Sequence, residues 1–259
     1  MTDGDVASGG AGPRDLSYDA VMARRSEIML ASVGIDYNRF ARGRIAFDYE
    51  GMMRETGYSL DEIERIQRET NVGRTPLIEL RNITELVRRM SPPGKGATIL
   101  VKDEACNPSG SFKARRASVS VYHAKKLGYK GVIAATSGNY GAAVASQAAM
   151  RGLKCIVVQE VYDSRGLGQP EIVEKGRACE SYGAEVVQLS VGPELFYVFL
   201  RLLEETGYFN ASLYTPFGIA GVETQRADRA DPRRGDERRK TDVRIDRRFD
   251  GRRPRGGHD

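Results

Sequence analysis

A lysine directly after a Pro/Gly/Ser turn is the residue of this chain best suited to chemistry. It is Lys113, in the stretch NPSGSFKARRA, and the following KARRASVSVYHAKKL predicts a helix that holds Lys113 in its first turn. Ser109 or Ser111 is expected to cap this helix. The positive end of a helix dipole lowers the cost of deprotonating an amine, which suits a nucleophilic lysine. A solvated surface lysine is the alternative that the stretch alone leaves open.

A second loop with a chemical use is TSGNYGAA, which follows the apolar run GVIAA and opens a helix of small residues. Backbone N–H groups at such a helix start, with the hydroxyls of Thr136 and Ser137, form a site for a carboxylate or a phosphate. Gly138 and Gly141 are expected to let a ligand approach the backbone closely. A tight turn without a ligand is the alternative. An amine beside an anion-binding loop suits Schiff-base chemistry on an amino acid.

The elements around these loops alternate between strand and helix patterns. Runs of Val, Ile and Ala predict strands at 131–136, 154–160 and 184–190, and a helical pattern follows each of them. Shorter strands are expected at 75–80 and 98–104. Strands this apolar, each followed by a helix, indicate an α/β fold with an open parallel sheet and helices on both faces. Ligands of such sheets bind beyond the carboxyl ends of the strands, where both loops are expected.

Composition divides the chain into four expected parts: a disordered N-terminus, a helical N-terminal extension, an incomplete catalytic domain and a disordered tail rich in Arg, Asp and Gly. In the helical extension, Ser59 and Glu62 predict a capping box. In chain order, the four parts comprise residues 1–17, 18–72, 73–225 and 226–259.

The net charge of +5 comes from the tail alone. The chain has 40 Lys+Arg and 35 Asp+Glu, and residues 226–259 hold 13 and 8 of these, which leaves a neutral body. A neutral body gives no electrostatic reason to expect nucleic acid or a membrane as a partner. The N-terminus lacks the apolar core of a signal peptide, and no apolar run approaches the roughly 20 residues that cross a bilayer. A cytoplasmic protein is therefore expected.

The three cysteines and the central histidine are assigned structural roles. Cys106, Cys155 and Cys179 lack the spacing of a disulfide framework or a zinc site, so reduced thiols and no metal site are expected. Cys106 is interpreted as a small packing residue. His123 lies within the predicted helix, ten residues after the lysine, and is interpreted as structural or exposed.

The order TPLIEL, VKDEACNPSGSFKARRA and ATSGNYGAA resembles the pyridoxal-phosphate enzymes of fold type II, the tryptophan synthase β type. Threonine synthase, cysteine synthase and serine/threonine dehydratases belong to this group. Glu104 to Lys113 match its Glu-x-x-Asn-Pro-Thr/Ser-Gly-Ser-Phe-Lys pattern in full, whereas Ala114 stands where many members have Asp. The resemblance implies that Lys113 carries pyridoxal 5'-phosphate and that Asn139 hydrogen-bonds the ring oxygen of the cofactor. It also implies a substrate-carboxylate site formed by Thr136, Ser137, Gly138 and Asn139.

From about residue 16 to 224, the chain is similar to the β subunits of 2-amino-4-oxopentanoate thiolase, by stretches such as SYDAVMARRSEIM, YDSRGLGQPEI and NASLYTPFGIAG. The resemblance implies an acyltransferase of ornithine degradation that cleaves this amino acid to acetyl-CoA and alanine, with coenzyme A as co-substrate and a small α subunit as partner. Cleavage between C3 and C4 leaves a carbanion on C3, whose charge the cofactor would have to accept. Another pyridoxal-phosphate-dependent lyase or dehydratase, or a threonine synthase-like enzyme, is the alternative with the same cofactor.

The family's Gly-rich phosphate loop, and the Ser or Thr that faces the pyridine nitrogen, are expected long after Lys113, and neither is found in this sequence. Family-like sequence stops near Gln225, and the 34 residues that follow include twelve Arg and only five apolar residues. We therefore expect a truncated subunit whose reading frame changed near Gln225, which binds the cofactor weakly and tends to aggregate. The alternative of another class is an inactive fragment or a protein that binds partners through its basic tail.

Overall fold

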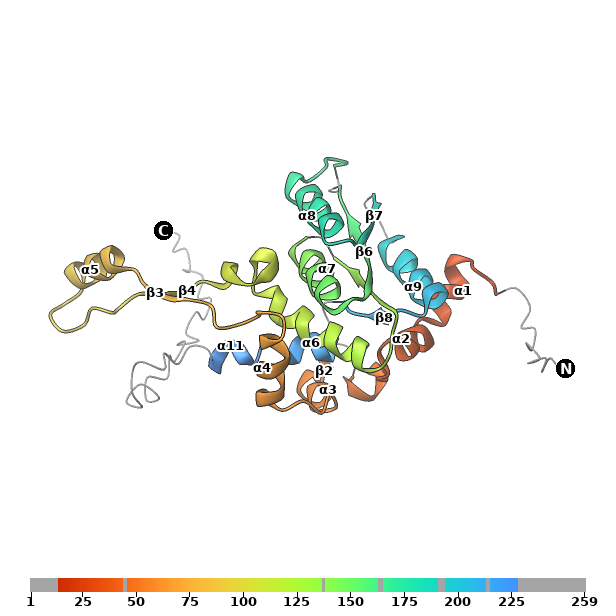
Figure 1. Ribbon diagram of the computed structural model, residues 1–259, viewed down its shortest axis with the longest axis horizontal. Helices are drawn as coiled ribbons and strands as arrows, with labels where there is room; N and C mark the ends of the chain where they lie inside the picture. The colour runs from red at the N-terminus through yellow and green to blue at the C-terminus, as the bar shows by residue number, and fades with distance from the viewer. Residues whose placement is uncertain are drawn as a thin grey trace, which may run out of the picture.

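The centre of the computed structural model is a four-stranded parallel sheet, in the order β7-β6-β5-β8 (Figure 1). The described residues are 14–43, 46–136, 138–162, 165–190, 194–212 and 215–227. The sheet confirms the predicted open parallel architecture, while β8 is a strand that the sequence pattern did not indicate. The strands are β5 (Gly131–Ala135), β6 (Lys154–Glu160), β7 (Glu185–Leu189) and β8 (Phe209–Asn210).

Helices cover both faces of this sheet, because its strands are apolar on both sides. Alternate residues of a strand point to opposite faces. Accordingly, Val132 and Ala134 join one core cluster, with residues of α6, α7 and α8, while Ile133 joins the other, with residues of α1, α2 and α9. The helices are α1 (Tyr18–Ala23), α2 (Arg25–Val33), α6 (Lys113–Lys126), α7 (Asn139–Arg151), α8 (Pro170–Ser181) and α9 (Glu194–Thr206).

The remaining elements come from both ends of the described chain. The capping box predicted at the start of α4 is confirmed: the Ser59 hydroxyl accepts from the Glu62 N–H, and the Glu62 carboxylate accepts from the Ser59 N–H. Helix α4 packs against α6, and so does α10. These elements are η1 (Tyr37–Phe40), β1 (Ala41–Arg42), β2 (Ala46–Phe47), α3 (Tyr49–Arg54), α4 (Leu60–Arg68), α10 (Pro216–Ala220) and α11 (Thr224–Ala227).

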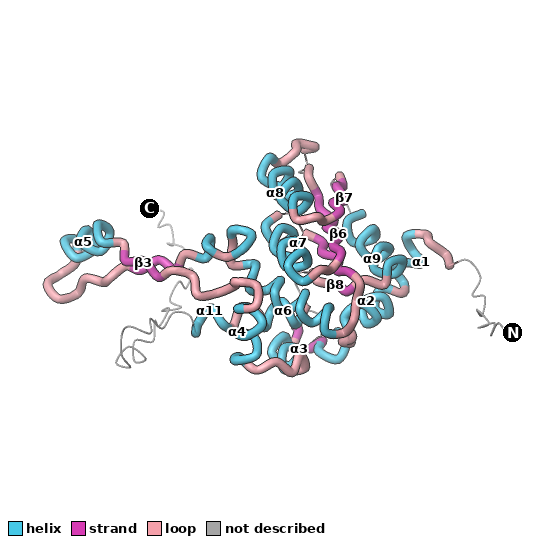
Figure 2. The backbone as a smooth tube through the Cα atoms, viewed as in Figure 1, coloured by secondary structure: helices cyan, strands magenta, loops and turns pink. Residues whose placement is uncertain are grey.

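An arm extends from this body (Figure 2). It consists of β3 (Leu77–Glu79) and β4 (Leu100–Lys102), which pair antiparallel in a sheet of their own, with α5 (Arg81–Met90) between them. A two-stranded ribbon is marginally stable alone, so it needs a further surface to pack against. Exposed large apolar side chains gather on this arm, at Leu77, Ile78, Ile83, Leu86, Met90, Leu100 and Val101.

Two short helical turns, η2 (Glu104–Cys106) and η3 (Pro108–Gly110), lead from the arm into α6. Within the described ranges, no helix combines the length and the apolar character that crossing a bilayer requires. The predicted N-terminal segment up to residue 13 and the predicted tail from residue 228 lie outside the described residues.

Candidate active site

The two predicted loops each end at the first residue of a helix. Helix α6 begins at Lys113, as the sequence predicts, and α7 begins at Asn139. Both helices join β5 through short connections, 127–130 and 136–138, so each runs back along the strand. Their N-termini therefore lie at the carboxyl edge of the sheet, where α/β proteins bind ligands. The turn η3 packs against α7, which brings the lysine loop next to the second helix.

A buried ion pair fixes the backbone around Lys113. The Arg115 guanidinium donates from Nε to Glu104 Oε2 at 2.7 Å and from Nη2 to Glu104 Oε1 at 2.9 Å. The Arg115 side chain is 0% exposed and that of Glu104 is 13% exposed. Thr75 Oγ1 and Asn107 Nδ2 also donate to the Glu104 carboxylate, at 2.7 and 2.9 Å. The first residue of the lysine motif is thus bonded to the residue two positions after the lysine.

These hydrogen bonds decide the ionisation of Glu104. Burial alone would raise the pKa of the carboxyl group, but the hydrogen bonds from Arg115, Thr75 and Asn107 outweigh it, so the pKa lies below its ordinary value. Glu104 is therefore held as a carboxylate that stays with Arg115, rather than as a proton donor for catalysis.

Gln67 and Thr224, which are distant in sequence, complete the hydrogen-bond network around Arg115 and Glu104. Thr224 Oγ1 accepts from Arg115 Nη1 at 3.2 Å and donates to Gln67 Oε1 at 2.6 Å. Gln67 Nε2 then donates to the carbonyl oxygen of Arg115 at 3.1 Å. The sequence pattern does not indicate these partners, because nothing local connects positions 67 and 224. The only sequence signal was the position of Arg115, two residues after the lysine.

The predicted serine caps of α6 are wrong. Phe112 occupies the N-cap position, and no side chain caps the helix. The Oγ atoms of Ser109 and Ser111 are buried and have no hydrogen-bond partner among the described residues. Two orphaned hydroxyls beside a partly buried lysine are donors that an anionic, carbonyl-bearing ligand can use, so this region fits pyridoxal phosphate.

The second loop offers open backbone at the start of α7. Thr136 Oγ1 accepts from the Gly138 N–H at 3.2 Å. A Cβ atom at Gly138 would meet no atom within 4 Å, and Asn139 is exposed, so a ligand can reach both residues. The expectation for Gly141 is wrong, because a Cβ there would lie 2.7 Å from Thr136 Cγ2 in the packed interior. The predicted site residue Ser137 lies outside the described residues.

The structural interpretation of His123 is confirmed. Its ring stacks on Phe217 with 3.7 Å between the ring centroids, and Nδ1 is 2.8 Å from the Tyr58 hydroxyl oxygen. Burial lowers the pKa of His123 to about 4, and the nearby charge of Lys126 acts in the same direction. The imidazole is therefore neutral at physiological pH and packs as an aromatic ring.

The thiols divide into two kinds. All three cysteines are free, as expected. Cys155 and Cys179 are buried, and burial raises the pKa of Cys155 to about 12. Cys106 is exposed, so its interpretation as a packing residue is wrong. Its thiol donates to Asp103 Oδ2 at 3.4 Å. Across the described ranges, no cluster of His, Cys, Asp or Glu could hold a metal ion.

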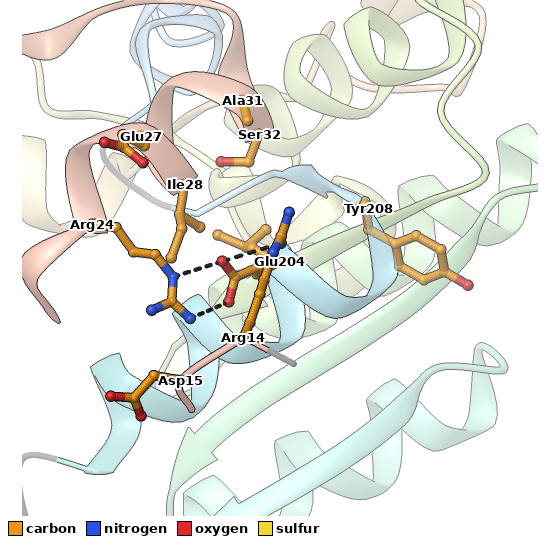
Figure 3. A pocket seen from close by; sticks show the side chains of 11 residues that line it. Arg14, Asp15, Arg24, Glu27, Ile28, Ala31, Ser32, Glu204 and Tyr208 are labelled. Carbon is orange, nitrogen blue, oxygen red and sulfur yellow. Dashed lines mark hydrogen bonds and ion pairs between the residues drawn. The ribbon is translucent and has the colours of Figure 1, made fainter. Parts of the chain in front are cut away.

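Two cavities lie away from the lysine loop. One, of about 410 Å³, is lined by residues of α2 and α9, by Arg14 and Asp15 before α1, and by Gly207 and Tyr208 after α9 (Figure 3). In it, Arg24 donates to both carboxylate oxygens of Glu204 at 2.8 Å, and Arg14 lies 3.4 Å from the same carboxylate. The hydrogen bond from Arg24 is the main cause that lowers the pKa of Glu204. The ion pair between Arg24 and Glu204 thus links the start of α2 to α9, and the Glu204 carboxylate is paired with arginine. The second cavity, of about 350 Å³, is lined by Glu69, Thr70, Tyr122, Lys125, Lys126, Met150 and Arg151.

Comparison with known proteins agrees with this geometry. Residues 68–227, more than half of the chain, match the family described as pyridoxal-phosphate dependent enzyme. The chain belongs to this family. A solved structure of a T.th. threonine deaminase is similar to this chain, with a TM-score of 0.52 and 31% sequence identity. The match covers 66% of this chain and 50% of the deaminase. The expected fold type II architecture is therefore confirmed.

Two curated relatives are much more similar in sequence. A protein of Acetoanaerobium sticklandii named 2-amino-4-ketopentanoate thiolase beta subunit is 75% identical over 211 residues. A second protein of this name, from an unknown prokaryotic organism, is 72% identical over 211 residues. In both cases the match covers 82% of this chain and 45% of the relative, so the chain spans less than half the length of these relatives.

Proposed function

We propose that this chain acts as part of the β subunit of a pyridoxal-phosphate-dependent thiolase. The substrates would be 2-amino-4-oxopentanoate and coenzyme A, and the products acetyl-CoA and alanine. The observation that carries this proposal is the 75% identity over 211 residues to a thiolase β subunit. The lysine at the start of α6 and the open loop at the start of α7 supply the chemistry that this reaction needs.

The lysine and the start of α7 would have separate roles in this reaction. Lys113 Nζ would attach the cofactor and, when released, take the proton from the substrate Cα. The start of α7 would hold the substrate carboxylate through Thr136, Ser137, Gly138 and Asn139, because helix N-termini favour anions. Asn139 would also contact the ring oxygen of the cofactor. When bound, pyridoxal phosphate supplies an electron-withdrawing ring that stabilises negative charge beside the substrate amine.

The Glu104–Arg115 pair would orient this site without touching the substrate. It lies on both sides of Lys113 in the sequence and fixes the turn before the lysine against the first turn of α6. Holding a reacting group in one geometry lowers the barrier of the reaction that follows.

The proposed enzyme includes a second, smaller α subunit, because the similar curated proteins are named as beta subunits. The enzyme would be located in the cytoplasm, since the reaction consumes coenzyme A. The domain division of the sequence also remains part of the proposal, with a helical extension at 18–72 and a catalytic part at 73–225.

The test is product analysis with the chain, the small α subunit, pyridoxal phosphate, 2-amino-4-oxopentanoate and coenzyme A. We expect acetyl-CoA and alanine in equal amounts, and none with Lys113→Ala. Lys126→Ala is the matched control, because Lys126 lies at the other end of the same helix. Equal yields from Lys113→Ala would contradict the proposal. Release of ammonia and an oxo acid without coenzyme A would instead indicate a lyase or dehydratase.

A further inference from the structure

The polar side chains of the lysine loop fall into two sets. Glu104 and Asn107 are bonded to protein groups: Asn107 Oδ1 accepts from the Gly73 N–H at 2.9 Å, and Asn107 Nδ2 donates to Glu104. Ser109 and Ser111 lie in the same stretch, yet within the part of the chain that the structure describes neither hydroxyl has a partner. The side chains of Glu104 and Asn107 thus stabilise the loop, whereas the hydroxyls of Ser109 and Ser111 contribute no hydrogen bond to it.

Such hydroxyls work against stability unless a ligand uses them. A buried hydroxyl without a partner loses its hydrogen bonds to water and gains none in exchange. Ser111 is only 8% exposed, and Ser109 has a left-handed backbone φ of 71°. In folded proteins a buried polar group without a partner is rare, and binding of a ligand is one reason to keep it.

The position of Ser111 defines what this ligand group would be. Ser111 precedes the N-cap residue Phe112 directly, and no side chain caps the first N–H groups of α6. The Ala114 N–H donates to the Ser111 carbonyl oxygen at 3.2 Å and the Arg115 N–H donates to the Phe112 carbonyl oxygen at 3.0 Å. The positive end of the helix dipole still favours an anionic oxygen here. Lys113, two residues away, adds a positive charge or a reactive amine to the same place.

We propose that the Ser111 hydroxyl binds an anionic oxygen of the ligand that meets Lys113. The group is either the phosphate of the cofactor, to which Ser111 would donate in addition to the family's Gly-rich loop, or the carboxylate of the amino-acid substrate, to which it would donate in addition to the start of α7. Ser109 is a second donor to the same group. This inference rests on the proposed function, which requires a ligand with both groups. It explains why the motif holds two serines that the fold itself does not use.

The first test is thermal unfolding of the chain without cofactor, for Ser111→Ala and a matched variant, Thr215→Val. Thr215 is also buried, but its hydroxyl accepts from the Gly218 N–H at 3.4 Å and contacts Ser120 Oγ at 3.2 Å. We expect Ser111→Ala to melt at or above the wild-type temperature and Thr215→Val to melt below it. A melting temperature of Ser111→Ala that falls like that of Thr215→Val would overturn the proposal, because the hydroxyl would then be structural.

The second test is binding of the cofactor, followed by the absorbance of its adduct with Lys113. We expect Ser111→Ala to weaken the affinity about ten- to 100-fold for the group that Ser111 contacts, since a hydrogen bond to a charged group is lost. Weaker binding of pyridoxal phosphate but not of pyridoxal assigns the phosphate. Weaker binding of alanine to the loaded chain, with both aldehydes unaffected, assigns the carboxylate. Wild-type affinity for all three ligands would refute the inference.

A third measurement separates this inference from the proposed function. Inorganic phosphate and acetate carry the two candidate groups without the cofactor. If no adduct forms on Lys113, the proposed use of the cofactor fails, yet one of these anions should still raise the melting temperature of the wild type and not of Ser111→Ala. If neither anion distinguishes the two proteins, the proposed anion contact fails as well.

Discussion

Replacement of Arg115 by Met tests whether the Glu104–Arg115 pair holds the lysine loop in place. The variant loses the two bonds to Glu104 and the bond to Thr224. It leaves the largely buried Glu104 carboxylate with the hydrogen bonds from Thr75 and Asn107. Breaking one side of a buried ion pair typically costs about 3–5 kcal/mol. For a chain of this size, each kcal/mol lowers the melting temperature by about 2–4 °C, so a fall of roughly 10 °C is expected.

The matched control is Arg54→Met. Arg54 pairs with Glu50 at 2.5 Å, but the two side chains are 74% and 75% exposed. Exposed pairs of this kind contribute about 0.3–0.5 kcal/mol, so the melting temperature should fall by only about 1–2 °C. Differential scanning calorimetry of the three proteins at neutral pH measures both effects. If Arg115→Met melts within about 2 °C of Arg54→Met, the network does not hold the loop.

The pH dependence of Arg115→Met gives a second check of the same reasoning. In the wild type the folded pKa of Glu104 is lowered, so its contribution to stability is present above the unfolded pKa of 4.5 and is lost as pH falls through the folded pKa. Without Arg115, burial dominates and raises the pKa of Glu104. The difference in stability between the two proteins should therefore begin to shrink above pH 4.5, where Glu104 of the variant takes up a proton, and shrink further as the pH falls through the lowered folded pKa of the wild type. A constant difference from pH 7 to pH 3 would show that the charge of Glu104 is not involved.

Two further predictions follow from the packing. Gly141→Ala should destabilise the fold by about 1–3 kcal/mol, because its Cβ would lie 2.7 Å from Thr136 and 2.8 Å from Val157. Gly168→Ala is the control, because its Cβ would make ordinary contacts. Equal urea midpoints for the two variants would contradict this prediction. His123 has a folded pKa of about 4 against an ordinary 6.5, so the unfolded chain binds a proton first and stability should fall as pH drops from about 6.5 to 4. His123→Gln should flatten this slope, and an NMR titration midpoint near 6.5 would disprove the burial argument.

The parallel sheet was predictable because its strands are long apolar runs with a helix after each. In β6, the run Lys154–Glu160 has five consecutive buried residues, which only a strand covered on both faces can use. By contrast, β8 is two residues long and pairs with Val132 and Ile133 only after the chain has folded back. A strand this short carries no periodicity, so its pattern could not have revealed it.

The site was predictable where its residues are adjacent in the chain and not where they meet through folding. Lys113 and Asn139 follow turn signals, and the structure places both at helix starts. The Thr224–Gln67 hydrogen bond joins positions 157 residues apart, which no local pattern records. The serine caps failed for a local reason: α6 starts two residues after Ser111, with Phe112 at its N-cap, so the hydroxyls are not used by the helix.

The central claim is that the loop before α6 presents Lys113 as the cofactor lysine. The direct measurement is incubation of the chain with pyridoxal phosphate, reduction with borohydride, and peptide mapping of the labelled lysines. We expect the label on Lys113 in preference to Lys125 and Lys126 of the same helix, even if the affinity is low. A label distributed over surface lysines without preference for Lys113 would contradict the account.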